Sequence, residues 1–159
     1  SFGHGVLADS GEWAHTVLGL QGSSPDLGIA RLEREDHLVG TVEILGTRDG
    51  NPMSLLGETA AGYVIGYEPH AGAGVAVVLN RAARTVELRE LPSRALLASA
   101  VFPVHTNQRY LVEASLSDGL VSVGIDGDLR LTATAPLNAG HWTAAYVENA
   151  EAAFASTRP

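Results

Sequence analysis

The chain has 159 residues, of which 45% are hydrophobic and 18% are charged, and it contains no cysteine. This length and composition predict one ordered domain over residues 1–159 and exclude thiol chemistry, disulfide bonds and cysteine-ligated zinc. The net charge is −8 and the ten basic residues, all arginine, are scattered along the chain, so nucleic acid and anionic membranes are poor partners.

The dominant pattern along the chain is an alternation of apolar and polar residues with a period of two, which indicates β-strands. In chain order the predicted strands are residues 13–20, 27–33, 38–45, 61–68, 75–80, 86–89, 94–101, 110–116, 121–125, 129–134, 141–147 and 151–155. Within the strand 61–68, the alternation places Tyr63, Ile65 and Tyr67 on one face. Loops are expected near residues 22–26, 47–58 and 69–74.

Turn signals support this strand pattern. The steps Asp118-Gly119 and Asp126-Gly127 predict tight hairpin turns that join three consecutive strands into a meander. No long helix and no internal repeat interrupts the series. About a dozen short strands at this spacing are typical of an all-β sandwich or barrel.

A group of carboxylates offers one catalytic hypothesis. Glu33, Glu35, Asp36 and Glu43 lie within eleven residues. On a strand, Glu33 and Glu35 would point the same way about 7 Å apart, within the range of separations that glycoside hydrolases use. A small glycosidase or lyase with Glu33 or Glu35 as acid or base is therefore possible. The alternative is that the run 34–37, between two apolar strands, is a solvated turn.

Two segments offer oxygen ligands for calcium, namely Asp126-Gly127-Asp128 and residues 47–51, but neither matches a complete calcium-binding loop. The Asp126-Gly127 step is explained equally by a hairpin turn. The six histidines show no zinc-ligand spacing, and the chain has no Gly-x-Ser-x-Gly motif. Calcium is therefore the one cofactor candidate, and we predict no catalytic residues from these motifs.

Aromatic residues amid polar groups are a further signal, because sugars stack their C–H faces on rings while carboxylates, arginines and amides bind the hydroxyls. The larger rings are Trp13, Tyr63, Tyr67, Tyr110, Trp142 and Tyr146. The alternative is that these rings fill the core of the domain. Tyr67, next to Glu68 and His70 at a predicted strand end, is the strongest candidate for a site.

The second half of the chain resembles a known family. The resemblance is carried, in order, by the segments AGYVIGY (61–67), VVLNR (77–81), VELR (86–89), YLVEA (110–114), VSVGIDG (121–127), GHW (140–142) and AAF (152–154). This succession is similar to the concanavalin A-like (laminin-G-like) jelly roll and, more narrowly, to β-sandwich modules appended to fructan-cleaving and related glycoside hydrolases. The resemblance covers residues 33–154.

The resemblance implies an all-β, two-sheet antiparallel sandwich with a sugar site at a concave face or at loops along one edge. In such modules an acidic residue, an arginine and an aromatic commonly bind a terminal sugar. In the fructan-associated modules, the strand that matches residues 62–67 often ends in Phe-Arg, whereas here it ends in Gly66-Tyr67, which argues against fructan specificity. The Glu-x-Asp-x-x-Glu string of the glycosidase members is missing from this sequence, which argues against an enzyme.

The leading hypothesis is a non-catalytic carbohydrate-binding module of a larger secreted bacterial glycoside hydrolase, which binds a polysaccharide, an oligosaccharide or a terminal sugar. The candidate ligand-binding residues are Glu33, Asp36, Arg48, Tyr67, Glu68 and Trp142. One alternative is a structural sandwich that packs on a catalytic domain and binds no sugar; the other is the glycosidase with Glu33 and Glu35. No apolar run approaches the roughly 20 residues of a membrane-spanning helix, so we expect no membrane partner.

Overall fold

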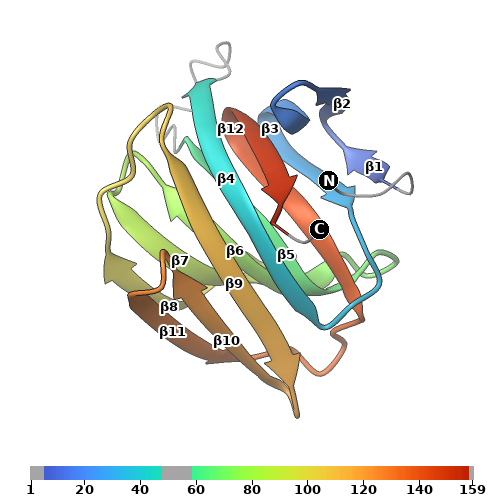
Figure 1. The fold of residues 1–159 in the computed structure, drawn as a ribbon. Coiled ribbons are helices and arrows are strands. Elements are labelled where there is room, and N and C mark those ends of the chain that lie inside the picture. Colours follow the sequence, from blue (N-terminus) through green and yellow to red (C-terminus); the bar gives the residue numbers. More distant parts are fainter. Residues whose placement is uncertain (1–5, 48–58, 158–159) are drawn as a thin grey trace.

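The computed structural model describes residues 6–47 and 59–157, which form β-strands and turns without a helix (Figure 1). The strands are β1 (Leu7–Ser10), β2 (Glu12–Thr16), β3 (Gly19–Arg31), β4 (His37–Thr47), β5 (Ala60–Glu68), β6 (Ala73–Asn80), β7 (Thr85–Leu91), β8 (Ala95–Val101), β9 (Arg109–Ser117), β10 (Leu120–Ile125), β11 (Leu129–Thr134) and β12 (Trp142–Ser156). The predicted strands between residues 38 and 134 are all confirmed. The described residues contain no apolar helix of membrane-spanning length.

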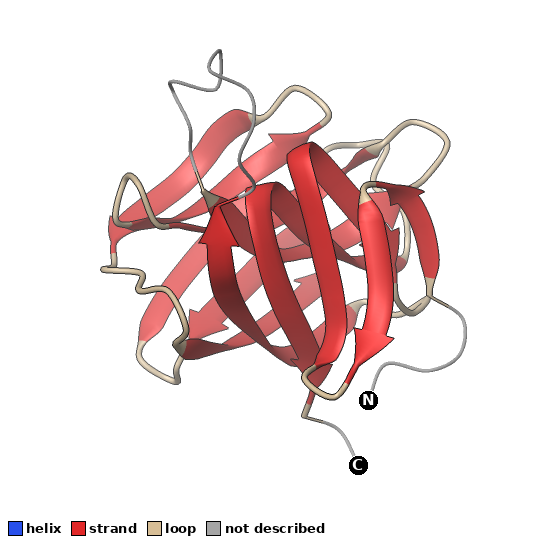
Figure 2. Ribbon diagram, turned by 90° about the horizontal axis from the view of Figure 1, so that it is seen from above, coloured by secondary structure: helices blue, strands red, loops and turns tan. Residues whose placement is uncertain are grey.

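Backbone pairing arranges these strands in two antiparallel sheets that share the two long strands β3 and β12. The front sheet, nearer the viewer in Figure 1, has the order β11-β10-β9-β4-β12-β3-β2. The back sheet has the order β1-β3-β12-β5-β6-β7-β8. Seen from above, the two sheets lie one behind the other (Figure 2). The predicted all-β, two-sheet antiparallel sandwich is thus confirmed.

The strand β12 passes from one sheet to the other at a bulge. Its residues 142–148 pair with β5 in the back sheet, and its residues 150–156 pair with β4 in the front sheet. Between them Asn149 has a φ of 45°, and the pairing with β3 shifts register at the same point. A bulge bends a strand without reversing it, so the prediction of two separate strands, 141–147 and 151–155, is wrong. The predicted loop at 22–26 likewise lies inside β3.

The main core lies between the sheets. Its largest fully buried side chains are Tyr63, Tyr110, Phe154, Ile44, Ile65, Leu79, Leu88, Ile125, Val42 and Val75. The rings of Tyr63 and Phe154 meet edge to face with centroids 5.4 Å apart, and the Tyr63 hydroxyl donates to the Thr41 carbonyl oxygen at 2.6 Å. The Tyr110 hydroxyl accepts from the His105 backbone N–H at 2.7 Å. These two tyrosines therefore fill the core, as the alternative interpretation predicts.

A second apolar cluster lies on the opposite, outer face of the back sheet, and Tyr67 belongs to it. Gly66 adopts a φ of 66°, and the pairing between β5 and β6 shifts register between Ile65 and Glu68. This bulge turns Tyr67 away from the face that Tyr63 and Ile65 share. The prediction that all three side chains share one face is therefore wrong for Tyr67, because strict alternation holds only for a regular strand.

The Asp-Gly turns are confirmed. Asp118 and Gly119 have φ of 52° and 76°, and Asp126 and Gly127 have φ of 52° and 77°, as hairpins with two left-handed central residues require. The Asp126 Oδ1 atom also accepts the Leu111 backbone N–H at 2.7 Å. This carboxylate therefore has a structural role in holding the hairpin.

Candidate functional site

The outer face of the back sheet carries a floor of small side chains. Cross-strand pairing places Ala144 of β12 beside Val64 of β5, and Val64 beside Ala76 of β6. All three are 0% exposed, although they point away from the core between the sheets. The same row ends in an arginine on either side, Arg31 of β3 next to Ala144 and Arg89 of β7 next to Ala76.

The turn between β7 and β8 folds over this floor and carries Arg94 with it. The Arg94 backbone N–H donates to the Glu90 carbonyl at 2.6 Å, and Arg89 Nη1 donates to the Arg94 carbonyl at 2.8 Å. The Arg94 guanidinium then reaches Glu148 of β12, 3.4 Å from Nη1 to Oε1, and Asp26 of β3, 3.8 Å from Nη2 to Oδ1. Because β5 and β6 lie between β7 and β12, the turn and the Arg94 side chain together cover the distance across these two strands.

Two further pairs complete the arrangement. Glu87, only 6% exposed, accepts from Arg89 Nε at 2.8 Å and from the Thr85 hydroxyl at 3.0 Å. The Tyr146 hydroxyl donates to Glu148 Oε1 at 2.7 Å. Burial raises the pKa of Tyr146 far above its ordinary value, and the negative charge of Glu148 raises it further. We call the following set the arginine cluster: Asp26, Glu87, Arg89, Arg94, Tyr146 and Glu148.

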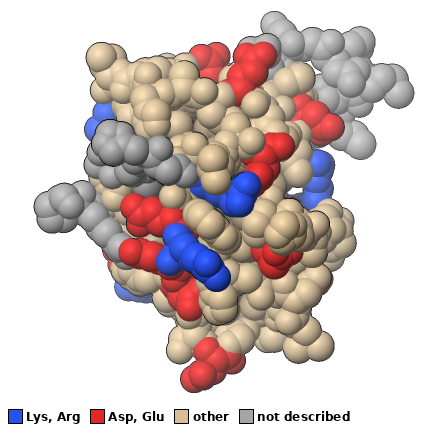
Figure 3. Space-filling model, turned by 90° about the vertical axis from the view of Figure 1, so that its right-hand side faces the viewer, with Lys and Arg blue, Asp and Glu red and all other residues tan. Residues whose placement is uncertain are grey.

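A second polar group lies toward the other end of the same face, and we call Asp9, Arg31, Tyr67 and Trp142 the tryptophan cluster. Arg31 Nε binds Asp9 Oδ2 at 3.0 Å, and the Arg31 guanidinium carbon lies 5.5 Å from the centroid of the half-buried Trp142 ring. The negative charge of Asp9 lies near the buried Tyr67 hydroxyl and, after burial, contributes to the raised pKa of Tyr67. Figure 3 views the molecule from the right-hand side of Figure 1, and acidic and basic side chains are interspersed there rather than gathered in patches of one charge.

The buried tyrosines predict an alkaline loss of stability. Burial raises the pKa of Tyr63 and Tyr146, and burial together with Asp9 raises that of Tyr67 to about 12. Each group is more easily ionised in the unfolded chain, whose tyrosine pKa is about 10. Their contribution to the free energy of unfolding is therefore complete below about pH 10 and is lost as the pH rises toward 12 and above.

Phenolate absorbance of the folded and the urea-unfolded protein, recorded against pH, measures this difference. We expect the unfolded protein to titrate near pH 10 and the folded protein to show delayed steps, one of which disappears in Tyr146→Phe. Complete ionisation of the folded protein near pH 10 would contradict the prediction.

The structure brings predicted site residues together around the start of β12. The Glu33 carbonyl accepts the Thr143 N–H at 2.7 Å, and the Thr143 hydroxyl lies 3.1 Å from the same carbonyl oxygen. Asp36 Oδ1 lies 3.0 Å from His141 Nδ1. Trp142 pairs with Tyr67 across β12 and β5. Glu33, Asp36, Tyr67 and Trp142 are thus neighbours of residues 141–143, although their contact with a ligand stays a prediction.

Glu68 has a local structural partner. Its Oε2 atom accepts the Ala71 backbone N–H at 2.6 Å, and this hydrogen bond lowers the pKa of the Glu68 carboxyl. The carboxylate therefore holds the β5–β6 turn. The remaining predicted ligand residue, Arg48, lies outside the described residues.

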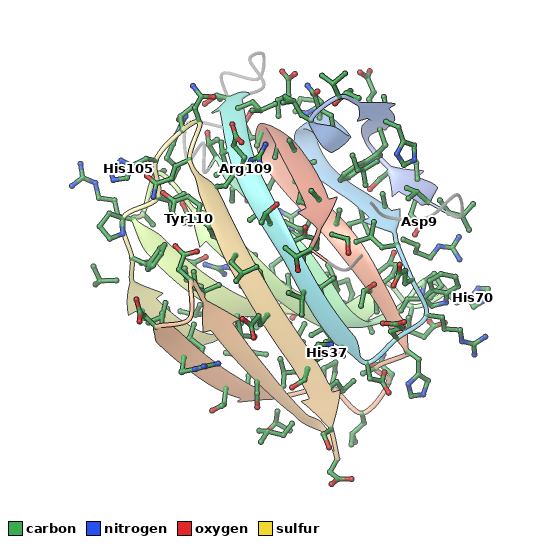
Figure 4. All side chains as sticks on the ribbon, in the orientation of Figure 1. Asp9, His37, His70, His105, Arg109 and Tyr110 are labelled. Atoms are coloured by element: carbon green, nitrogen blue, oxygen red, sulfur yellow. The ribbon has the colours of Figure 1, made fainter. Side chains whose placement is uncertain are left out.

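The four carboxylates of the glycosidase hypothesis have different surroundings. Glu43 binds Arg109 Nε at 3.3 Å across β4 and β9, whereas Asp36 contacts His141 at the other end of β4. Figure 4 labels Arg109 and His37, which mark these two ends of the front sheet. The use of Glu33 or Glu35 as a catalytic group stays a hypothesis.

Within residues 6–47 and 59–157, no three side chains of His, Asp or Glu are grouped so that they could hold a metal ion. The described calcium candidate, Asp126-Gly127-Asp128, forms the hairpin turn between β10 and β11, and calcium binding there stays a prediction. Of the other candidate segment, 47–51, only Thr47 is described. Its hydroxyl binds Arg81 Nη2 at 2.6 Å.

The sequence reasoning missed the arginine cluster. The alternation of Val86 and Leu88 with Glu87 and Arg89 does signal a strand with one polar face, so those two charged residues could have been selected. Arg94 gives no such signal, since only the folding of the β7–β8 turn brings it to Glu148.

No protein-family model matches the chain, and no curated protein sequence matches it. Solved structures do match. The carbohydrate-binding module CBM66 from Bacillus subtilis is 19% identical, with 96% of this chain and 92% of that chain covered and a TM-score of 0.80. The chain has the concanavalin A-like jelly-roll fold. The fold predicted from the resemblance is thus confirmed.

Two further structures with this jelly roll are less similar. A protein of unknown function with a galectin-like fold, also from Bacillus subtilis, is 11% identical over 96% of this chain and 87% of that one, with a TM-score of 0.57. The exoplasmic/lumenal domain of VIP36, in its Ca²⁺- and Man3GlcNAc-bound form, is 14% identical over 96% and 85%, with a TM-score of 0.51. At these identities the likeness establishes the fold only.

Proposed function

We propose that this domain is a carbohydrate-binding module that holds a sugar on the outer face of the back sheet, at the arginine cluster. The observation that carries the proposal is the position of Arg94. Its ion pairs with Glu148 and Asp26, at 3.4 and 3.8 Å, are longer than the roughly 2.7–3.2 Å of good N–H···O hydrogen bonds. A guanidinium with five N–H donors, 40% exposed, therefore keeps donors available for a ligand.

The chemistry of this cluster suits a saccharide. Neighbouring sugar hydroxyls can accept from a guanidinium and donate to a carboxylate at the same time, and both groups are held within one cluster here. Leu27 lies opposite Glu148 on β3 and is partly buried against the apolar floor, so it can contact the C–H face of a sugar ring. Asp26, 89% exposed, can accept hydroxyls at the rim.

The tryptophan cluster extends the proposed surface. Trp142 is partly exposed, and its ring packs against the same apolar cluster that carries Tyr146. We include it as a contact for a second sugar unit. Tyr67, 4% exposed, acts in this proposal as the neighbour that pairs with Trp142 across β5 and β12 rather than as a stacking surface.

Similar structures support the sugar-binding proposal, since one bears the name of a carbohydrate-binding module and another was solved with Man3GlcNAc. We further propose that the domain belongs to a larger secreted bacterial glycoside hydrolase, and the resemblance to modules appended to such enzymes supports this. The accessory role without sugar binding has one observation in its favour. Leu120 and Leu137 are 47% and 109% exposed, and both line a cavity of about 670 Å³ at one end of the sandwich.

A binding screen tests the proposal. The domain is tested by thermal shift and calorimetry against levan, inulin, arabinan, galactan, xylan and their monosaccharides, each with calcium and with chelator. We expect saturable binding of at least one glycan, with no product formed, in both conditions. Turnover that is lost in Glu33→Gln or Glu35→Gln would establish the glycosidase instead. An absence of both binding and turnover would contradict the proposal and favour the accessory role.

A further inference from the structure

A second polar surface lies on the other side of the sandwich, on the outer face of the front sheet. It is a hollow of about 300 Å³ over β4, β9, β10 and β11, and we call it the front hollow. The polar residues that line it, such as Glu113, Ser115 and Ser122, alternate along their strands with the core residues Ala114, Val121 and Val123. The front hollow therefore faces solvent, on the side of the sandwich opposite to the arginine cluster.

One row of the front hollow sets an arginine and a glutamate on either side of a glycine. Gly124 of β10 pairs with Arg130 of β11 on one side and with Glu113 of β9 on the other. A Cβ atom at Gly124 would lie 2.6 Å from Arg130 Nη1, so the guanidinium lies over the space that the missing side chain leaves. Within the described residues, neither Arg130 nor Glu113 has a hydrogen-bond or ion-pair partner for its side chain.

The next row supplies hydroxyl groups. Ser122 of β10 pairs with Thr132 of β11 and with Ser115 of β9, and Ser115 pairs with His37 of β4. The three hydroxyls also have no side-chain partner within residues 6–47 and 59–157. Two adjacent rows of the sheet thus present side-chain donors and acceptors that no other described residue uses.

We propose that the front hollow is a second saccharide-binding site. A ligand with a net charge would be attracted by one of Arg130 and Glu113 and repelled by the other. A neutral ligand rich in hydroxyls can accept from Arg130, donate to Glu113 and exchange hydrogen bonds with the serine and threonine hydroxyls. The volume, at the lower end of the usual range for ligand sites, limits the contact to a short stretch of a glycan.

This proposal makes the domain bivalent, with one site on each outer face. It stands on residues that the arginine cluster does not use, so the two sites can be tested separately. Two sites that face in opposite directions cannot bind neighbouring units of one extended chain, and they would link two chains instead.

The test is a map of backbone amide shifts in ¹⁵N-labelled protein, titrated with fructose, arabinose, galactose, xylose and short oligosaccharides of levan, arabinan, galactan and xylan. Glycine serves as a zwitterionic probe. We expect saturable shifts at Ser115, Ser122, Gly124 and Thr132 with at least one sugar and none with glycine. The affinity at these amides should fall by about tenfold or more in Arg130→Gln.

Two variants separate a binding role from a general effect. Gly124→Ala keeps both charges and has no unfavourable φ, but its Cβ atom displaces the Arg130 guanidinium, so we expect the same loss of affinity. Arg109→Gln removes an equal charge from the same face, where Arg109 pairs with Glu43, and should leave the affinity unchanged within about twofold.

Each outcome decides the matter. Shifts confined to the arginine cluster would overturn this inference and support the proposed function. Shifts confined to the front hollow would support this inference and contradict the proposed site at the arginine cluster. Shifts with glycine alone, an equal loss in Arg109→Gln, or no saturable shift at the front hollow with any of the sugars would each overturn the second site.

Discussion

Arg94→Met is expected to lower the affinity for the glycan found in the screen by roughly 100-fold, a loss of about 3 kcal/mol that is usual for a central binding arginine. Methionine keeps much of the apolar stem but removes every N–H donor. It also leaves Glu148 with its hydrogen bond from the Tyr146 hydroxyl but without its ion pair to Arg94, so the carboxylate loses this countercharge at the site. Calorimetry of the folded variant measures the loss.

Two controls accompany this experiment. Arg84→Met removes the same charge from an exposed position in the β6–β7 turn and should bind with unchanged affinity. Glu148→Gln keeps the shape of the side chain and should weaken binding by about tenfold, because a neutral amide is a weaker acceptor than a carboxylate. Undiminished binding by Arg94→Met would remove the arginine cluster from the site.

Gly62→Ala is expected to prevent stable folding, with a loss of more than about 4 kcal/mol in the free energy of unfolding. A Cβ atom at this position would overlap the Val77 carbonyl oxygen and approach Val78 Cα at 3.3 Å. These are backbone atoms of β6, which pairs with β5 at Gly62 and Val78. They cannot move without breaking the pairing at the centre of the back sheet.

Urea unfolding followed by near-ultraviolet circular dichroism tests this expectation. Gly46→Ala is the matched control, since Gly46 also lies in a strand but a Cβ atom there would have no neighbour within 4 Å. Its free energy of unfolding should change by about 0.5 kcal/mol or less. A Gly62→Ala variant with the stability of the control would show that β5 and β6 can separate locally at this position.

The period-two pattern predicts β4 and β9 most directly, because alternate residues of each strand are buried between the sheets and the residues between them are at least partly exposed. It failed where a single residue breaks the alternation. Gly66 and Asn149 each sit at a bulge, and neither the reversed face of Tyr67 nor the continuity of β12 can be inferred from alternation alone.

The site was predictable only in part, for a related reason. Glu33, Asp36 and Tyr67 lie beside residues 141–143 because strand ends at one end of a sandwich are close in space. The arginine cluster depends instead on the β7–β8 turn, which brings the long side chain of Arg94 to Glu148 and Asp26. The conformation of this turn, with a φ of 65° at Arg94, decides where the Arg94 side chain lies. That conformation cannot be predicted from the amino-acid type alone.

The place of β12 at the centre of both sheets has a consequence for how the protein is made. This strand is the last of the described strands to leave the ribosome, yet β3, β4 and β5 all pair with it. Until it arrives, those three partners have unpaired edges, and the nascent chain holds two incomplete half-structures with exposed apolar surface. We therefore expect folding to be completed only after synthesis has passed residue 156, when β12 can pair with strands of both sheets.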